Sequence, residues 1–202
     1  MPQELSLLDW KRRVFELYAH VRAAADPEAA WRRWRETRDE LFRTHPQTPL
    51  PSVGREWFRG LDYWPYDPAL RVVAAVVERE PETLEIQTSG DGTIRFDRFA
   101  AARFELAGEP QELQLYWLEG YGGGVFLPFA DETSGSESYG GGRYLLDTVK
   151  GSDLGGDDGR VVLDFNFAYN PSCAYDIRWV CPLAPPANRL PISVRAGERR
   201  PA

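Results

Sequence analysis

Two polar stretches in the second half of the chain hold the side chains with the most chemical potential. Residues 126–146 are rich in glycine and hydroxyl groups, and residues 163–190 combine carboxylate, amide, thiol and phenol groups. Loops that only join strands are rarely so long or so polar. We therefore expect a functional site where the two stretches meet, with these ligand-binding candidates: Asp131, Thr133, Tyr139, Gly140, Gly141, Arg143, Asp164, Asn166, Asn170 and Tyr175.

The triple glycine at 140–142, followed by Arg143, suits an anionic ligand. Glycine permits positive φ and close backbone approach, so successive N–H groups can form a nest for a carboxylate or phosphate. No Gly-Lys-Ser follows, as a Walker loop requires, and no parallel βαβ unit surrounds it, as a dinucleotide fingerprint requires. A glycine-rich bulge that leads into a strand explains the same residues, so both interpretations stay open.

Asp164 and Asn166 are expected on one face of a strand over residues 161–167, because side chains alternate along a strand. A strand over residues 143–149 would bring Arg143 beside them. The three side chains then either line a polar pocket, or Arg143 and Asp164 form a buried salt bridge that holds the two strands in register.

An enzyme, most simply a hydrolase, is the alternative to a binding protein. Its catalytic candidates are Asp164 and Cys173, with Arg143 as the electrostatic stabiliser. A catalytic thiol needs a group that takes its proton, and neither of the two histidines has a local pattern linking it to Cys173. Packing of Cys173 against Cys181 as two small buried thiols is the simpler interpretation.

No metal site or cofactor is predicted. Two cysteines and two distant histidines lack the ligand spacing of a zinc site. The loop at residues 150–160 carries three aspartates but lacks the spacing and the final glutamate of an EF-hand, so a solvated hairpin loop is favoured over a calcium loop.

Charge and hydropathy restrict the classes of partner. A net charge of −7 argues against nucleic acid, because neutralising phosphates needs a basic face. The first residues do not read as an export signal. The longest apolar run, residues 72–77, is far short of the roughly 20 residues of a membrane-spanning helix. These features predict a cytoplasmic protein with free thiols, no membrane or nucleic-acid partner, and a small anionic ligand; the oligomeric state stays open.

Two helices are expected at the N-terminus. Residues 6–23 have apolar side chains at helical spacing after a capping-box pattern, Ser6 with Asp9. A second helix follows, with Asp26 as its cap and Pro27 in its first turn. The two helices form a hairpin over residues 1–44, and a connection rich in proline and aromatic residues occupies 45–69.

From residue 70 to residue 198, the spacing of apolar residues is typical of strands and no longer of helices. Short connections between strands favour an antiparallel arrangement. We expect one α+β domain over residues 1–202, with the helical hairpin packed on a β-sandwich or partly open barrel of about nine strands, at residues 70–78, 82–88, 93–100, 103–107, 112–118, 125–129, 143–149, 161–167 and 191–195.

Two motifs, YGGGRY at residues 139–144 and NPSCAY at 170–175 followed by CPL at 181–183, are long and unusual in combination. On these motifs the chain resembles an uncharacterised bacterial and archaeal family, domain of unknown function 1684, from Leu8 to Glu198. The resemblance implies no activity. It singles out Asp131, Thr133, Gly135, Tyr139, Gly140, Gly141, Arg143, Asp164, Asn166, Asn170, Cys173, Tyr175, Cys181 and Asn188 as the pattern positions. A purely structural role, in which these residues only fix turns and strand register, is the third hypothesis.

Overall fold

Two antiparallel helices open the fold, α1 (Gln3–Ala23) and α2 (Pro27–Thr44), in a computed structural model that describes residues 2–201. The α2 cap is confirmed, because the Asp26 carboxylate accepts hydrogen bonds from the amides of Glu28 and Ala29 at 3.0 and 3.1 Å. The capping box at Ser6 is wrong. The helix α1 begins three residues earlier, and the Ser6 amide donates to the carbonyl of Pro2 at 3.1 Å. Within the described residues, neither helix has an apolar stretch that would let it cross a bilayer.

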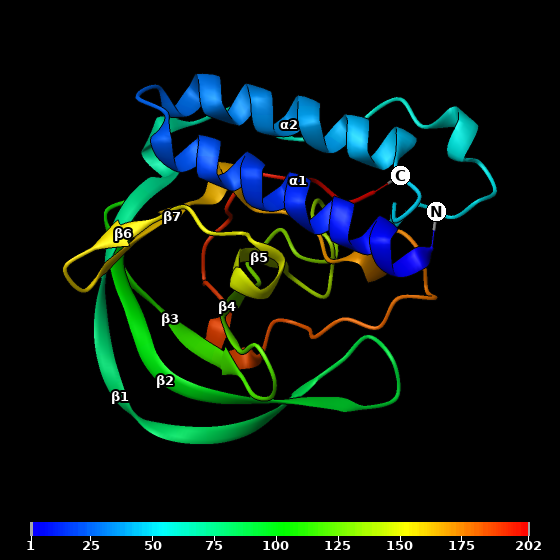
Figure 1. Ribbon diagram of the computed structural model, residues 1–202. Helices are drawn as coiled ribbons and strands as arrows, with labels where there is room; N and C mark the ends of the chain where they lie inside the picture. Colours follow the sequence, from blue (N-terminus) through cyan, green and yellow to red (C-terminus); the bar gives the residue numbers. More distant parts are fainter. Residues whose placement is uncertain (1, 202) are drawn as a thin grey trace.

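Seven strands form one antiparallel sheet in the order β5-β4-β3-β2-β1-β7-β6. The α+β class is thus confirmed. The edge strands β5 and β6 do not pair with each other, so the sheet is not closed, and a sandwich or barrel is not confirmed. The sheet curls strongly, with the two helices lying opposite the long bend of β1 and β2 (Figure 1). The strands are β1 (Arg71–Gln87), β2 (Thr93–Leu106), β3 (Glu109–Leu118), β4 (Gly124–Phe129), β5 (Arg143–Asp147), β6 (Gly156–Asp157) and β7 (Arg160–Asp164).

The strand number differs from the expected nine because two pairs of predicted strands are continuous. A register shift between Glu78 and Glu82 accommodates Pro81 inside β1, so the chain bulges there without turning back. Residues 93–106 likewise form one strand, β2. Residues 191–195 form no strand, since side chains of the first polar stretch take their backbone hydrogen bonds. One-turn 3-10 helices occupy Arg55–Trp57, Pro68–Leu70, Thr148–Lys150, Phe165–Phe167, Ser172–Ala174 and Pro186–Asn188.

The first part of the second polar stretch, around residues 165–167, lies between the helices and the sheet. Trp34 of α2 is completely buried, and its ring centroid lies 5.2 Å from that of Phe167. The indole nitrogen of Trp31 donates to the carbonyl of Asn166 at 2.9 Å. On the other side of this stretch, Phe165 packs edge-on against Phe129 of β4, at a centroid distance of 5.1 Å. The aromatic core therefore fixes residues 163–170 from both sides.

Candidate functional site

The loop between β4 and β5 folds around the fully buried carboxylate of Asp131. Its oxygens accept hydrogen bonds from the hydroxyls of Thr133 at 2.9 Å and Ser134 at 3.1 Å, and from the backbone N–H of Val194 at 2.7 Å. These donors all belong to the protein. Asp131 and Thr133 therefore hold the loop in shape and tie it to the C-terminal segment.

Arg143, at the start of β5, is also buried, with 1% of its surface exposed. Its guanidinium donates to the carbonyl of Val194 at 2.9 Å and to that of Ala196, and Asp131 Oδ1 lies 3.5 Å from its Nη2. Burial lowers the pKa of Arg143 to about 10, which still leaves it charged at neutral pH. Arg143 thus supplies the C-terminal segment with the hydrogen bonds that a neighbouring strand would otherwise give.

The expected contact between Arg143 and Asp164 is not formed. The Arg143 guanidinium lies against the rings of Trp64 and Phe129, 5.2 and 4.9 Å from their centroids. The nearest cation to Asp164 is Arg71, at 3.8 Å. The two motif residues therefore belong to different contact networks.

β7 ends at Asp164 because this side chain bonds the backbone just ahead of it. Its Oδ1 accepts from the amide N–H of Asn166 at 3.0 Å and from the Asn166 side chain at 2.8 Å, a local arrangement that competes with the strand ladder. Residues Phe165–Phe167 consequently turn into a 3-10 helix where a strand was expected. The Asn166 carboxamide bonds both backbone groups of Asp67, at 2.9 and 2.8 Å, and so anchors the 45–69 connection.

Burial raises the pKa of Asp164 to about 6, against the hydrogen bonds from Asn166 and the charge of Arg71. The carboxyl borders a small cavity of about 60 Å³ between the helical hairpin and β7. That volume has room for water but not for an organic ligand. As a catalytic candidate, Asp164 thus faces very little free space.

A buried carboxylate at residue 198 joins several motif residues. Glu198 Oε2 lies 2.9 Å from Arg38 Nη2 and accepts from the amide of Asn170 at 3.0 Å, while the Tyr175 hydroxyl donates to Oε1. The Asn170 side chain donates to the carbonyl of Arg199 at 2.7 Å. Burial raises the pKa of Glu198, and the positive charge of Arg38 opposes that rise.

A pocket of about 870 Å³ opens above this carboxylate, and we call it the motif pocket. Three of the ten predicted ligand-binding residues, Tyr139, Gly140 and Tyr175, line it. The predicted residues Asp131, Thr133, Gly141, Arg143, Asp164, Asn166 and Asn170 do not. The rest of its wall comes from residues 50–62 except Ser52 and Glu56, from Gly135 and Ala174, and from residues 198–201.

Positive charge and exposed apolar surface meet in the motif pocket. Its arginines are Arg55, Arg59, Arg199 and Arg200, and its acidic residues are Asp62 and Glu198. Asp62 pairs with Arg199 at 3.1 Å, and Glu198 is held by Arg38. Trp57 and Val53, also in the wall, are 70% and 87% exposed. The pocket therefore keeps uncompensated positive charge beside an apolar surface that nothing in residues 2–201 covers.

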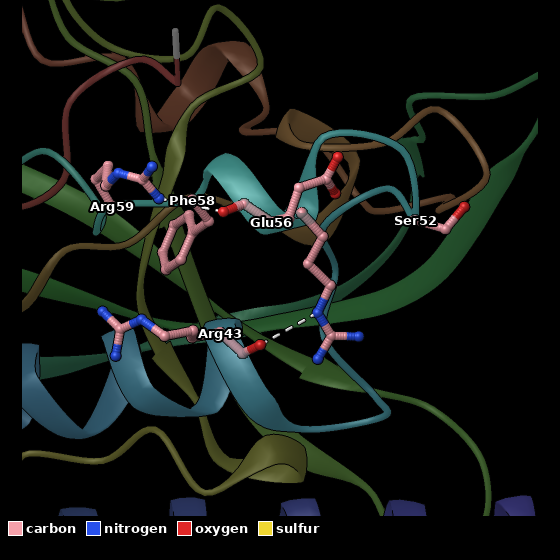
Figure 2. A pocket seen from close by; sticks show the side chains of 6 residues that line it. Arg43, Ser52, Glu56, Phe58 and Arg59 are labelled. Atoms are coloured by element: carbon pink, nitrogen blue, oxygen red, sulfur yellow. Dashed lines mark hydrogen bonds between the residues drawn. The ribbon is translucent and has the colours of Figure 1, made fainter.

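A second hollow, of about 580 Å³, lies on the same connection and shares Arg55, Phe58 and Arg59 with the motif pocket. In Figure 2 the Arg59 guanidinium lies above the Phe58 ring and the Arg43 guanidinium lies below it. Arg55 Nε donates to the carbonyl of Arg43 at 3.2 Å. Fourteen arginines pair with a carboxylate of the described residues, but Arg43, Arg55, Arg59 and Arg200 do not. Four of the eight arginines that pair with no carboxylate of the described residues are thus gathered around this connection, while Arg12, Arg33, Arg35 and Arg189 line neither hollow.

The model of the family described as "Protein of unknown function (DUF1684)" matches residues 56–199. The chain belongs to this family. The matched DUF1684 region contains both polar stretches and most of the motif-pocket wall, whereas α1 and α2 lie outside it. A search of curated proteins gave no match.

A similar chain has been solved by NMR in solution, the uncharacterized protein from gene locus rrnAC0354 of Haloarcula marismortui. It is 40% identical in sequence, with a TM-score of 0.61, and the similarity covers 85% of this chain and 93% of that one. The two proteins thus share most of their length as well as the fold.

Cys173, the other catalytic candidate, lies beside the motif pocket in this DUF1684 chain. Its sulfur is 3.5 Å from the Tyr139 hydroxyl, and its neighbour Ala174 lines the pocket. The imidazole of His45 pairs with Asp9 at 3.2 Å. That histidine therefore gives Cys173 no base.

Sequence reasoning missed the arginines of the pocket and Glu198. The signal in the sequence was the presence of two arginines in each of two short segments. Arg55 and Arg59 lie in REWFRGLD at 55–62, and Arg199 and Arg200 lie in GERRP at 197–201. Neither segment has a glycine-rich or turn motif long enough to attract notice, and they lie far apart in the sequence. Only the folded chain brings them together around Tyr139 and Tyr175.

Proposed function

We propose that this protein binds a small organic anion in the motif pocket. The observation that carries the proposal is the composition of this pocket: it is lined by the motif residues Tyr139, Gly140 and Tyr175 and also by arginines that pair with no carboxylate of the described residues. Guanidinium groups are well suited to carboxylates and phosphates because they offer paired donors and a fixed charge.

The apolar part of the wall indicates what else the ligand contains. Exposed apolar surface beside a pocket is a usual mark of a binding site, and Trp57 offers a flat ring of this kind. We therefore expect an anion with an aromatic or aliphatic body, whose charged group faces Arg55 and Arg59 while its body covers Trp57 and Val53.

The other hypotheses gain less support. In the hydrolase hypothesis, Arg143 would stabilise negative charge on a substrate, but Arg143 is 1% exposed and does not line the motif pocket. The structural hypothesis fits Arg143, Asp131 and Asn166 well, yet it gives no reason for the arginines of the pocket. The proposal also includes a cytoplasmic location. It further includes a partly open barrel, which would hold the motif loops at its mouth.

A thermal-shift screen tests the binding function. The probes are aromatic carboxylates, aliphatic carboxylates, phosphate monoesters and inorganic phosphate, each measured on the wild type and on Arg59→Ala and Trp57→Ala. A ligand at about 100 times its Kd adds about 2.7 kcal/mol to stability, a rise of several degrees in Tm. We expect such a rise in the wild type. Without ligand, both variants should melt at the wild-type Tm, and adding ligand should not raise the Tm of either.

Arg12→Ala is the matched control, because Arg12 is an exposed arginine on α1, outside the motif pocket. This variant should respond as the wild type does. A wild type that no organic anion stabilises, or a shift that persists unchanged in Arg59→Ala and Trp57→Ala, would show that the motif pocket is not the binding site.

A further inference from the structure

The two cysteines lie together in a tightly held part of the fold. Cys173 sits in the 3-10 helix Ser172–Ala174, and Cys181 follows eight positions later in an extended segment. Both are buried free thiols, 8% and 7% exposed. The turn after β1 fixes Cys181 through Ser89, whose amide donates to the Cys181 carbonyl at 2.9 Å and whose hydroxyl accepts from the Cys181 amide at 3.1 Å.

The surroundings of the two sulfurs differ. Hydrogen bonding from the Cys181 thiol, then from the hydroxyls of Ser89 and Tyr139, lowers the pKa of Cys173 despite its burial. The interaction with Cys173 and burial raise the pKa of Cys181. Of the two thiols, Cys173 is therefore the one whose thiolate is favoured, and it is also the one whose neighbours line the motif pocket. This is the asymmetry of a dithiol in which one sulfur attacks and the other follows.

Simple packing does not account for these contacts. A thiol that serves only as a small apolar side chain is surrounded by apolar groups, whereas the sulfur of Cys173 has a phenol oxygen at 3.5 Å and a second thiol beside it. Access is also provided. Tyr139, whose hydroxyl lies 3.5 Å from the Cys173 sulfur, and Ala174, the next residue, both line the motif pocket, so the sulfur is next to residues of the pocket wall.

We infer that Cys173 and Cys181 form a dithiol that a hydroperoxide oxidises to a disulfide, with Cys173 as the attacking sulfur and Cys181 as the resolving one. The Cys173 thiolate attacks one peroxide oxygen, the O–O bond breaks, and after proton transfer a sulfenic acid and a water or alcohol result. The Cys181 sulfur then displaces hydroxide from the sulfenic sulfur, and its proton leaves with that hydroxide as water. Two thiols lose two electrons to one peroxide.

The test uses the full chain, reduced and freed of reductant, with hydrogen peroxide as the probe and intact mass as the readout. The wild type should lose the mass of two hydrogen atoms and recover it on reduction. Cys181→Ser should instead gain one oxygen atom and react with a sulfenic-acid trap such as dimedone. Cys173→Ser should react at least about ten-fold more slowly than the wild type.

Two results would overturn the inference. Either the folded wild type keeps its reduced mass under peroxide while the urea-unfolded chain oxidises, or Cys173→Ser is oxidised as fast as Cys181→Ser. Circular dichroism confirms that each variant is folded, and Cys173→Ala replaces the serine variant if it is not. No organic anion is present in the assay, so the outcome is independent of the proposed binding function.

Discussion

Arg38 of α2 and Glu198 of the C-terminal segment form a buried ion pair, with 2.9 Å between Nη2 and Oε2 and side-chain exposures of 13% and 1%. The pair joins the helical hairpin, which lies outside the region matched by the family model, to a residue inside it. Glu198 also receives the Tyr175 hydroxyl and the Asn170 amide. A residue of the helical hairpin therefore holds in place a carboxylate that lines the motif pocket.

Removing the carboxylate of Glu198 should be costly. In Glu198→Ala, Arg38 stays buried with its main negative partner gone, and breaking such a pair costs about 3 to 5 kcal/mol. Urea denaturation measures the change in the free energy of unfolding. The matched control is Glu137→Ala, which breaks an exposed pair with Arg195 at 2.8 Å and should cost less than about 1 kcal/mol. Equal losses in the two variants would contradict the prediction.

Arg143→Leu should destabilise the protein by a similar amount, about 3 to 5 kcal/mol, because it leaves the Asp131 carboxylate buried without its cation. It also removes the donors to the carbonyls of Val194 and Ala196. Because Arg143 does not line the motif pocket, the fraction that remains folded should bind an organic anion with wild-type affinity. Calorimetry at low temperature measures this, and a folded variant that fails to bind would place Arg143 in the site.

Two glycines of the triple glycine, Gly140 and Gly142, should differ in how well they tolerate substitution by alanine. Gly142 has φ of +89°, and a Cβ there would lie 2.5 Å from that of Ala184 and 2.6 Å from the carbonyl of Phe129. We expect Gly142→Ala to cost about 2 to 4 kcal/mol in the free energy of unfolding. Gly140→Ala, whose Cβ would meet only Gly135 Cα at 3.5 Å, should cost about 1 kcal/mol or less. Thermal unfolding of the two variants side by side checks this, and equal Tm values would refute it.

Asp164 should make the protein less stable as pH rises from 4 to 7. Its pKa is raised from 3.8 to about 6 by burial, so the folded state holds this proton more tightly than the unfolded state does. The stabilisation is complete below pH 4 and is lost as pH rises through 6. The difference amounts to about 3 kcal/mol.

Asp164→Asn should remove this pH dependence, since an amide does not titrate while it keeps an oxygen acceptor for the Asn166 amide. Relative to the wild type, the variant should therefore gain about 3 kcal/mol between pH 4 and pH 7 in urea denaturation. Other titrating groups are the same in both proteins and cancel in the difference. A constant difference over this range would mean that the carboxyl titrates alike in the folded and unfolded states.

The sequence predicted the elements whose signals are local. The Asp26 cap and the spacing of Trp31 and Trp34 were enough to place α2, because helix capping and amphipathic faces involve residues a few positions apart. The extent of β1 was not predictable in the same way. Pro81 looks like a turn in the sequence, and only pairing with β2 shows it to be a bulge.

The candidate site was predicted in part, for a similar reason. Chemical type drew attention to Tyr139 and Tyr175, which do line the motif pocket. The same criterion selected Arg143 and Asp131, whose polar atoms are used within the protein. A buried polar residue that bonds the backbone and one that binds a ligand can be the same type of residue. Only the hydrogen-bond partners in the folded structure distinguish the two roles.

The bond from Trp31 to Asn166 spans 135 positions, and those from Asn188 to Gln114 span 74. Contacts between such distant parts of a chain slow folding, because loop-closure entropy is lost before the contacts form. Helix–coil exchange within α1 and α2 takes about a microsecond or less, so the pairing of distant segments sets the folding rate. We therefore expect refolding in milliseconds to seconds, through a species that aggregates at high concentration, so dilute and cool conditions should favour its recovery.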